Sequence, residues 1–477
     1  MTDVYQKYET VIGLEVHIEL KTASKIFCGC PTDFGGKPNT QVCPVCAGLP
    51  GTLPTLNRHA VELGIKAGLA TGCSISPLSF FDRKNYFYPD LPKAYQISQN
   101  DLPLCRDGYV DITLNGKSKR IGIERIHLEE DAGKLVHTES GTLIDYNRCG
   151  VPLIEIVSRP DLRSAEEARA YLSELRLIMM YAGVSDCKMN EGSLRCDVNL
   201  SVRRIGDRSL GTRTEMKNIN SFAFVAQAIE YESKRQIDLL EGGGRVLMET
   251  RRFDSGTGKT HTMRVKEAAA DYRFFREPDL PPLQISDQIV STLKNSLPTL
   301  PRELRNTLKE KHGLPEDTAE IIVSRPAMSD YFLRAAELTA HTRTVANLMV
   351  SELLGTQAAD EFTPVLSAER LSAVAELFEG GEINSSTVKK LLSMLEKDAV
   401  STPEELVERH GMRQINDREL LYRELEKILE STPKLYEDYK NGKTAAKKAI
   451  IGKVMASTGG KANPIILNEL FENMTKS

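Results

Sequence analysis

The chain has 477 residues; 40% of them are hydrophobic, 27% are charged, and the formal net charge is −4. This length exceeds what one hydrophobic core supports, so we expect about two to four domains. The slightly negative charge excludes nucleic-acid binding through bulk charge and requires a local basic patch for any such binding. No apolar run approaches the roughly 20 residues that span a bilayer. The polar start of the chain lacks the features of a signal peptide, so we expect a cytoplasmic location.

The first expected element is a strand over residues 11–20, in which apolar and polar residues alternate. The polar positions are Glu15, His17 and Glu19. Because successive side chains of a strand point to opposite faces, the aliphatic residues face a core and the other face presents carboxylate, imidazole and carboxylate in a row. Such a row suits a hard divalent cation such as Mg²⁺. A sheet face that is simply open to water is the alternative.

Four of the nine cysteines lie close together in a loop that is rich in Gly, Pro, Asn and Asp. They are Cys28, Cys30, Cys43 and Cys46. In a reducing cytoplasm we expect thiols rather than disulfides. Two close pairs across a short loop place four thiolates within tetrahedral reach of Zn²⁺. The other five cysteines are isolated, and we expect them in the core or on the surface.

A segment that interleaves cations and aromatic rings follows at residues 81–90. It contains Arg83, Lys84 and Tyr86. Arginine and lysine pair with phosphates, and tyrosine rings stack on bases. This composition favours contact with a nucleic acid or a nucleotide over an ordinary surface loop.

Two segments in the middle of the N-terminal half strengthen the cation hypothesis. His127 is followed by Glu129, Glu130 and Asp131, and adjacent carboxylates repel one another unless a cation is present. Glu155 lies in residues 151–157, a run that is apolar on both faces and predicts a covered strand. A carboxylate there is costly unless it binds a metal or pairs with an arginine such as Arg195 or Arg203.

Two helices and a hairpin follow. Ser164 and Glu167 form a capping-box pattern that begins a helix ending near Gly183, and a second helix begins at Asn220 or Ser221 and ends at residues 242–244. Residues 194–203 alternate as a strand that returns through residues 211–218. This pattern indicates an α+β fold with a mostly antiparallel sheet.

Residues 255–260 read Ser-Gly-Thr-Gly-Lys-Thr and imitate a phosphate-binding loop. The motif requires a glycine where the chain has Phe253, and residues 260–267 alternate like a strand rather than a helix. We therefore interpret residues 255–258 as a hairpin turn, and any use of ATP must depend on another scaffold.

A Pro-rich stretch over residues 278–301 predicts a linker, and helical patterns follow it. We expect amphipathic helices over residues 317–324, 328–338 and 368–378, and a further helical segment from about residue 402 to the end. That last segment is basic, with Lys443, Lys447, Lys448, Lys453 and Lys461. A solvated face is the simpler interpretation of the lysines, but basic clusters also let a mildly acidic protein hold RNA.

Several long motifs resemble one family, the B subunit of the glutamyl-tRNA(Gln)/aspartyl-tRNA(Asn) amidotransferase, called GatB. The motifs are residues 11–20, 81–90, 127–133, 152–157, 191–197, 217–221, 249–254 and 263–267. The resemblance implies a mixed or antiparallel cradle domain over residues 1–292 with the zinc loop at 28–46. It also implies an all-helical domain over residues 293–401 and a small helical tail domain over residues 402–477. The tail is similar to the YqeY family, and the resemblance implies that the tail binds tRNA.

The resemblance also implies a ligand set and a reaction. The Mg²⁺ ligands of the family, one His and two Glu, map onto His17, Glu130 and Glu155, with Glu15 and Glu129 beside them. The strand parity of residues 127–130 does not decide whether Glu129 or Glu130 is the ligand, so the choice of Glu130 depends on the resemblance. ATP phosphorylates the carboxylate of Glu or Asp on the wrong tRNA, and ammonia from glutamine displaces the phosphate.

Further roles follow from the same resemblance. Lys84, Arg195 or Lys217 would hold the acyl phosphate, and the sequence does not choose among them. Arg83 and Tyr86 would join the lysines of the tail in contacting tRNA. The implied partners are an amidase subunit (GatA) and a small subunit (GatC), which form a heterotrimer with the chain. The implied cofactors are ATP, Mg²⁺ and structural Zn²⁺.

Two other functions remain as alternatives. A non-catalytic tRNA-binding scaffold suits the basic tail and the four cysteines, but RNA binding gains nothing from carboxylates near phosphate. An amidase in its own right would need a nucleophile, and the sequence contains no Gly/Ser-rich nucleophile stretch or recognisable cysteine signature.

Overall fold

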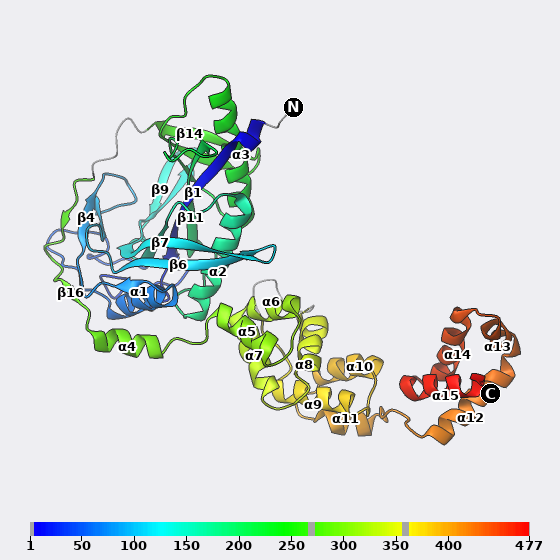
Figure 1. Ribbon diagram of the computed structural model, residues 1–477. Helices are drawn as coiled ribbons and strands as arrows, with labels where there is room; N and C mark the ends of the chain where they lie inside the picture. Colours follow the sequence, from blue (N-terminus) through cyan, green and yellow to red (C-terminus); the bar gives the residue numbers. More distant parts are fainter. Residues whose placement is uncertain (1–3, 266–271, 355–361, 477) are drawn as a thin grey trace. The chain divides into compact units, whose positions relative to one another are not determined.

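The computed structural model describes residues 4–265, 272–354 and 362–476. It divides into two compact units, residues 1–301 and residues 302–477 (Figure 1). Within the described ranges, no helix combines the length and the apolar character needed to cross a bilayer.

A nine-stranded sheet forms the centre of the first unit, in the order β14-β13-β12-β11-β1-β10-β7-β6-β2. Its strands are β1 (Tyr8–Glu19), β2 (Ser74–Ile75), β6 (Cys105–Leu114), β7 (Lys117–Glu130), β10 (Pro152–Ser158), β11 (Leu194–Arg204), β12 (Thr214–Lys217), β13 (Glu249–Asp254) and β14 (Lys259–Val265). Only β12 and β13 pair in parallel among the described strands. The expected α+β fold with a mostly antiparallel sheet is confirmed.

Strand β1 lies in the middle of the sheet, between β11 and β10. Ile12, Leu14, Val16 and Ile18 are buried with at most 1% exposure. Residues 15, 17 and 19 are half-buried on the opposite face. The alternation predicted from the sequence is therefore confirmed, and the polar face of the sheet carries the candidate site.

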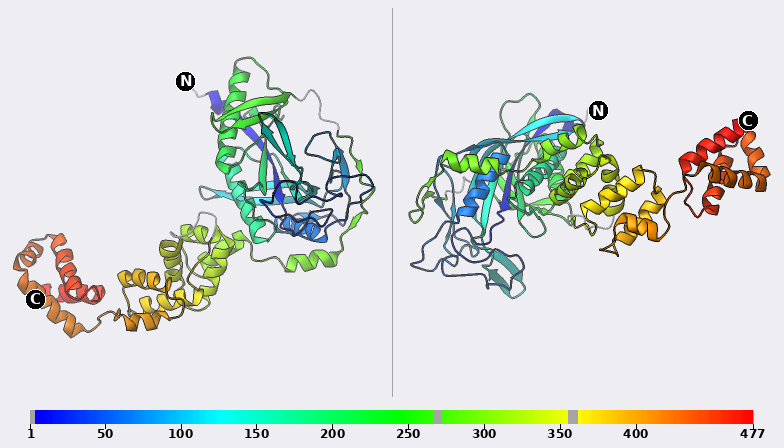
Figure 2. Two further views of the ribbon diagram at one scale, coloured as in Figure 1. Left: turned by 180° about the vertical axis from the view of Figure 1, so that it is seen from behind. Right: turned by 90° about the horizontal axis from the view of Figure 1, so that it is seen from below.

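Helices α1 (Arg58–Ala70), α2 (Ala165–Tyr181) and α3 (Phe222–Glu241) pack on the sheet of this unit. Helix α2 packs on β6 and α3, helix α3 packs on β11 and β14, and helix α1 packs on β6 and β7 (Figures 1 and 2). Ser221 caps α3, which settles the choice between residues 220 and 221.

Helix α2 begins as expected, but its cap is only half of the predicted box. The Ser164 side chain accepts a hydrogen bond from the Glu167 backbone N–H. The Glu167 carboxylate accepts a hydrogen bond from the backbone N–H of Arg163 instead of that of Ser164, and it also pairs with Lys119. Because Lys119 reaches Glu167 from β7, tertiary contact decides where this carboxylate lies.

The segment that imitates a phosphate loop is a hairpin turn, as predicted. Residues 255–258 connect β13 to β14, which pair antiparallel with Asp254 opposite Lys259. No helix follows the turn, so the geometry for cradling a phosphate at a helix N-terminus is missing from this part of the described chain. The expected strand is described to Val265, and residues 266 and 267 lie outside the described residues.

The Pro-rich stretch after residue 278 is not a bare linker, and that prediction was wrong. It contains β16 (Leu283–Gln284) and helix α4 (Asp287–Asn295). Val290 and Leu293 of this helix pack against the core of the first unit, and α4 contacts α1. Val290 and Leu293 are partly buried against this core, so apolar residues between the prolines hold the segment in contact with the unit.

Three small sheets surround the large one. One contains β15 (Phe275–Arg276), β4 (Asp82–Asn85) and β5 (Tyr95–Ser98); one pairs β16 with β3 (Leu78–Ser79); one pairs β8 (Lys134–Thr138) with β9 (Gly141–Asp145). Residues 82–85 of the cation–aromatic segment are therefore a strand in a packed sheet rather than a free loop.

The second unit is helical throughout its described residues (Figure 2). Its α-helices are α5 (Pro301–Glu310), α6 (Glu316–Val323), α7 (Pro326–Ala336), α8 (Thr342–Leu348), α9 (Ala368–Glu379), α10 (Ser385–Leu395), α11 (Pro403–Arg409), α12 (Arg418–Ser431), α13 (Pro433–Lys440), α14 (Thr444–Ser457) and α15 (Pro464–Lys476). The three helices predicted over residues 317–378 are confirmed within a few residues.

The last helices have a hydrophobic core of their own. It includes Leu421, Leu425, Ile450, Leu467 and Phe471. Helix α11, which the predicted boundary at residue 402 assigns to the tail, packs against α9 and α10. The division into three domains remains a prediction, and this packing favours a tail that begins after α11.

Candidate active site

Three side chains stand abreast on the polar face of the sheet, one from each of three neighbouring strands. His17 of β1 is paired with Glu155 of β10, and Glu155 is paired with His127 of β7. Because paired residues of adjacent strands point to the same face, the sheet register alone brings these groups together. Glu129 follows two residues after His127 and shares its face.

The distances in this group are those of a compact polar cluster. His17 Nε2 lies 3.3 Å from Glu155 Oε2 and 3.5 Å from Glu129 Oε1. His127 Nε2 lies 3.5 Å from Glu155 Oε2 and 3.6 Å from Glu129 Oε2. The side chains of His17, Glu129 and Glu155 each offer a ligand atom, and these atoms lie within 4.8 Å of one another. We call these three residues the cation cluster.

Because the two carboxylates of this cluster are buried, they destabilise the fold unless a cation compensates their charge. Glu129 is 2% exposed and Glu155 is 8% exposed. Two carboxylates this close repel each other, and water is largely excluded from them. Two carboxylates and one imidazole fit a divalent cation and leave coordination positions for water or phosphate oxygens. The residues present therefore suit the cation that the sequence predicted.

The histidines set the charge state of the cluster. Burial opposes the charged imidazolium, yet Glu155 accepts a hydrogen bond from His17 and the pKa of His17 rises to about 9. Burial also opposes the charged form of Glu155, but His127 and His17 hold its pKa well below its usual range. His127 holds the pKa of Glu129 down in the same way against burial. In the metal-free protein a proton on His17 therefore compensates the carboxylates.

Glu130, which the resemblance favoured as a ligand, lies apart from this cluster. Lys93 Nζ lies 2.5 Å from both oxygens of Glu130, and the backbone N–H of Ile97 donates to Oε1 at 2.9 Å. Consecutive strand residues point to opposite faces, so only one of Glu129 and Glu130 can face His17. The geometry places Glu129 beside His17 and Glu155, so we favour Glu129 as the ligand; the choice between Glu129 and Glu130 remains a prediction.

Arg195 reaches the site from β11, where it is paired with His17. Its Nη1 lies 2.8 Å from Asp131 Oδ2, and Arg148 approaches the same carboxylate to 3.3 Å. Burial opposes ionisation of Asp131, but the two guanidinium groups lower its pKa. Burial and the neighbouring Asp131 raise the pKa of Glu19 to about 8. Arg195 is thus held beside the cation cluster by a buried carboxylate.

A group of three acids lies beside the cation cluster on β1, β11 and β12. Glu15, Asp197 and Glu215 bring carboxylate oxygens within 4.8 Å of one another. Lys217 Nζ lies 2.5 Å from Asp197 and 3.1 Å from Glu215. Asn199 donates a hydrogen bond to Glu15 at 2.8 Å. Lys217 therefore compensates the charge of this group.

The cations of residues 81–90 differ in their surroundings. Arg83 makes a bidentate pair with Glu277 at 2.7 and 2.8 Å and stacks on the Tyr95 ring at 4.3 Å. Lys84 lies 5.0 Å from the centroid of the Tyr272 ring and lowers the pKa of Glu155. Tyr86 packs edge-on against Tyr272. Lys84 is the one of these cations whose charge reaches the cation cluster.

The four cysteines of the loop come together as the spacing predicted. Their sulfurs lie within 4.8 Å of one another, and the Cys43 and Cys46 sulfurs are 3.9 Å apart. Zinc–sulfur bonds of about 2.3 Å place tetrahedral sulfurs about 3.8 Å apart. All nine cysteines are free thiols, and Cys73, Cys105, Cys149, Cys187 and Cys196 are buried. The four loop cysteines therefore fit a structural Zn²⁺.

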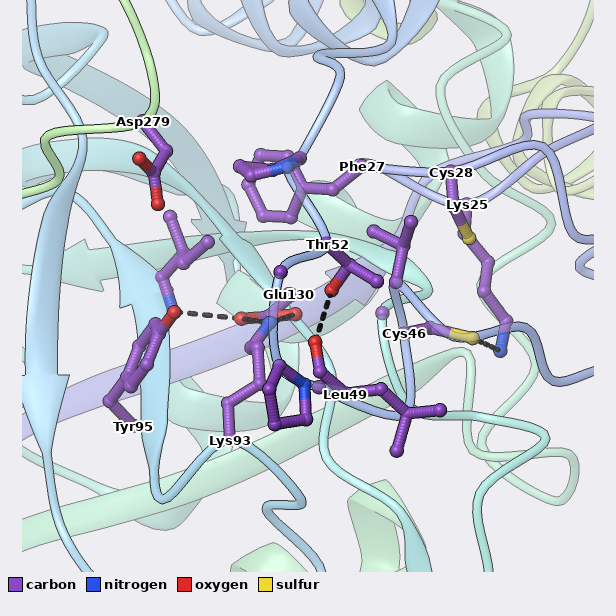
Figure 3. A pocket seen from close by; sticks show the side chains of 17 residues that line it. Lys25, Phe27, Cys28, Cys46, Leu49, Thr52, Lys93, Tyr95, Glu130 and Asp279 are labelled. Carbon is purple, nitrogen blue, oxygen red and sulfur yellow. Dashed lines mark hydrogen bonds and ion pairs between the residues drawn. The ribbon is translucent and has the colours of Figure 1, made fainter.

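A pocket of about 210 Å³ lies between the cysteine cluster and the Glu130–Lys93 pair. Figure 3 shows Cys28, Cys46 and Lys25 on one side of this pocket and Tyr95 on the other, with Glu130 between them. The cysteine loop therefore forms part of the wall next to Glu130.

The basic tail lies in the second unit. Lys443 pairs with Asp438 and Lys447 pairs with Glu472, both at 2.9 Å. Lys448 and Lys453 are exposed on α14. Two of the tail lysines are thus already compensated, and two point into solvent.

The structure adds residues that the sequence reasoning had not assigned to the site. His127, Asp131, Asp197, Glu215 and Lys93 all contact groups named above. A signal for His127 was present, because it shares strand parity with Glu129. Nothing in the sequence showed which strands would lie next to β1.

The fold and this site can now be compared with known proteins. A family model described as the GatB/GatE catalytic domain matches residues 10–291, which contain nearly all of the sheet and every residue of the cation cluster. The first unit therefore belongs to the catalytic-domain class that GatB and GatE proteins share. A second model, described as the GatB domain, matches residues 330–474.

Full-length relatives make the assignment specific. The aspartyl/glutamyl-tRNA(Asn/Gln) amidotransferase subunits B of Caldicellulosiruptor saccharolyticus and Thermoanaerobacter sp. are each 50% identical, over 98% of this chain and 98% and 99% of theirs. That of Thermodesulfovibrio yellowstonii is 48% identical over 98% of this chain and all of its own. The chain belongs to the GatB family, and the predicted resemblance is confirmed.

Proposed function

We propose that this chain is the subunit of a tRNA-dependent amidotransferase that activates the side-chain carboxylate of Glu or Asp esterified to a non-matching tRNA. The observation that carries the proposal is the cluster of half-buried His17 with the buried carboxylates Glu129 and Glu155 inside the matched catalytic domain. A scaffold that only binds RNA has no use for buried carboxylates that repel phosphate. The names of the relatives supply the class of substrate.

The proposed reaction has two steps. A carboxylate oxygen of the aminoacyl group attacks the γ-phosphorus of ATP, which gives an acyl phosphate and releases ADP. Ammonia, supplied by an amidase partner from glutamine, attacks the acyl carbon and expels inorganic phosphate, which leaves the amide. His17, Glu129 and Glu155 would hold Mg²⁺, which offsets the negative charge between the carboxylate and the phosphoryl group when bound.

The residues around the cluster support this chemistry by position and charge. Arg195 is paired with His17 in the sheet, and Asp131 fixes its guanidinium. Lys84 adds positive charge on the side of Glu155. Both cations suit a site that accepts two anionic reactants, because fixed charges cost no reorganisation when negative charge builds up. Lys217 is engaged by Asp197 and Glu215, so it is a weaker candidate for contact with phosphate.

Three further assignments accompany the proposal. The cysteine loop would hold one structural Zn²⁺, since four thiolates leave no open position for catalysis. The tail, with exposed Lys448 and Lys453, would contact the tRNA backbone. An amidase subunit and a small third subunit would complete a heterotrimer that works in the cytoplasm.

The test uses the heterotrimer reconstituted with the unmutated chain, with Glu155→Gln and with Glu124→Gln. Glu124 is exposed on β7 and serves as the matched control. Formation of Gln-tRNA and Asn-tRNA from the misacylated species is followed together with ATP cleavage. The proposal expects both activities to be lost only in Glu155→Gln. Full activity of Glu155→Gln would assign the chain the scaffold function instead.

A further inference from the structure

Lys25 is a lysine with no exposed surface, located beside the cysteine cluster. Its side chain is 0% exposed and is one of the largest fully buried side chains of the described chain. The backbone on both sides is fixed: the Lys25 N–H donates to Cys30 O at 2.9 Å, and the Ile26 N–H donates to Gly150 O at 2.9 Å. The ammonium group therefore cannot reach water without rearrangement of this loop.

The three N–H donors of the ammonium group have three acceptors. Nζ lies 2.8 Å from Gln41 O, 3.4 Å from Tyr146 O and 3.6 Å from Cys46 Sγ. No carboxylate of the described residues forms an ion pair with Lys25. Two carbonyl dipoles do not offset the cost of burying a full charge, so the position calls for an anion.

The cysteine cluster is the group that can provide this anion. Four thiolates around one Zn²⁺ exceed the charge of the metal by two negative charges. The backbone N–H of Cys43 also points to Cys46 Sγ, at 3.2 Å. Cys46 is buried, whereas the other three cysteines are half-buried, so its sulfur is the one that solvent compensates least.

We infer that Lys25 is the charge partner of a zinc–thiolate centre: its ammonium group compensates excess negative charge at Cys46 and thereby sets how firmly the loop retains the metal. This inference rests on the proposed zinc assignment and names a further residue on which that site depends. Replacing a residue that contacts a metal ligand but not the metal itself commonly changes the metal affinity by about 10- to 100-fold.

The chain offers a matched set of variants. Lys25→Met removes the charge and the donors, Lys25→Gln keeps donors without the charge, and Lys25→Arg keeps the charge. Lys37→Met removes a charge from the same loop at an exposed position and serves as the control. Zinc content is measured by elemental analysis of the full-length chain in its complex, and zinc release to a chromogenic chelator is timed.

The inference expects Lys25→Met and Lys25→Gln to release zinc about tenfold faster or more than the unmutated chain. Lys25→Arg should lie between them and the unmutated chain, and Lys37→Met should match the latter. Equal release from all five proteins overturns the role of Lys25. Absence of zinc from the freshly prepared unmutated chain overturns the zinc assignment itself, and the inference with it.

A second measurement separates charge pairing from ordinary packing. Lys25→Met is compared by thermal unfolding in the unmutated chain and in a chain with all four loop cysteines changed to serine. If Lys25 pairs with the metal centre, the substitution lowers Tm in the first background and leaves it unchanged or raises it in the second, because an unpaired buried charge is removed. An equal decrease of Tm in both backgrounds would mean that Lys25 stabilises the fold only through its hydrogen bonds to Gln41 and Tyr146, and it would overturn the inference.

Discussion

His17 and Glu155 are direct partners across the β1–β10 pair, and the His17 Nε2 atom lies 3.3 Å from Glu155 Oε2. The two side chains meet because their residues are paired in the register of the sheet, and no loop is needed to bring them together. A site built on paired strands is held more rigidly than one built on loops. This is why we expect substitutions here to change chemistry more than folding.

Replacing His17 by Ala or Glu155 by Gln should lower tRNA-dependent ATP cleavage about a hundredfold or more, because each change removes a ligand where negative charge builds up. Glutaminase activity of the partner subunit should remain measurable. ATP cleavage is followed with misacylated tRNA present, and Glu124→Gln is the control. Turnover close to that of the unmutated chain in either variant would refute the cation site.

Glu129 and Glu130 should differ sharply in cation binding although they are adjacent. Glu129→Gln should weaken Mn²⁺ binding at least about tenfold, whereas Glu130→Gln should leave it nearly unchanged, because Glu130 pairs with Lys93 on the other face. Titration of the bound Mn²⁺ by electron paramagnetic resonance checks this. The opposite order would restore Glu130 as the ligand.

The stability of the cation-free protein should fall as the pH rises from about 6.5 to about 9. The pKa of His17 is raised from its ordinary 6.5 to about 9 in the fold, so its stabilisation is complete below 6.5 and is lost as the pH rises toward 9. Glu19 acts in the same direction up to about pH 8. The pKa of Glu155 is lowered, so its contribution is complete above its ordinary 4.5 and does not change in this window.

The loss attributable to His17 is up to about 3 kcal/mol of unfolding free energy. Urea unfolding at several pH values measures it, and His17→Gln should show a shallower decline. Mg²⁺ affinity should rise over the same range, since the cation competes with the proton on His17. A flat stability profile for the unmutated chain would contradict the charge state assigned to the cluster.

The purified chain should contain one Zn²⁺, bound by Cys28, Cys30, Cys43 and Cys46. Removing it with a chelator should lower Tm without oxidation of the cysteines, because the loop loses the metal that links its two cysteine pairs. Elemental analysis and thermal unfolding with and without chelator provide the measurement. A disulfide between any two of the four residues would count against the site.

Deleting the chain after α11 should raise the KM for misacylated tRNA, more strongly at low salt than at physiological salt, while tRNA-independent glutaminase activity changes little. Lys448→Ala combined with Lys453→Ala should weaken tRNA binding more than the same changes at Lys443 and Lys447, which already pair with acids. Binding is measured at two salt concentrations. Equal affinity of truncated and full-length complexes would identify the lysines as a solvated face.

The sequence by itself determined the elements that carry the site. The alternation of residues 11–20 predicted a strand with one buried and one polar face, and the structure has that strand. The cysteine spacing predicted a tetrahedral cluster, and the sulfurs lie together. These predictions succeeded because strand alternation and short-loop geometry are local properties of the chain.

Only the tertiary structure decided which carboxylate belongs to the cation cluster, what Arg195 and Lys217 pair with, and that α4 packs on the core. The first two depend on which strands become neighbours, since β1 lies between β10 and β11, which are far away in the chain, and the third depends on the contact of α4 with α1. The periodicity of one strand gives the faces of its own side chains but not its register against a distant strand. The buried Lys25 shows the same limit, because a lysine in a sequence predicts solvent and only packing places it against a sulfur.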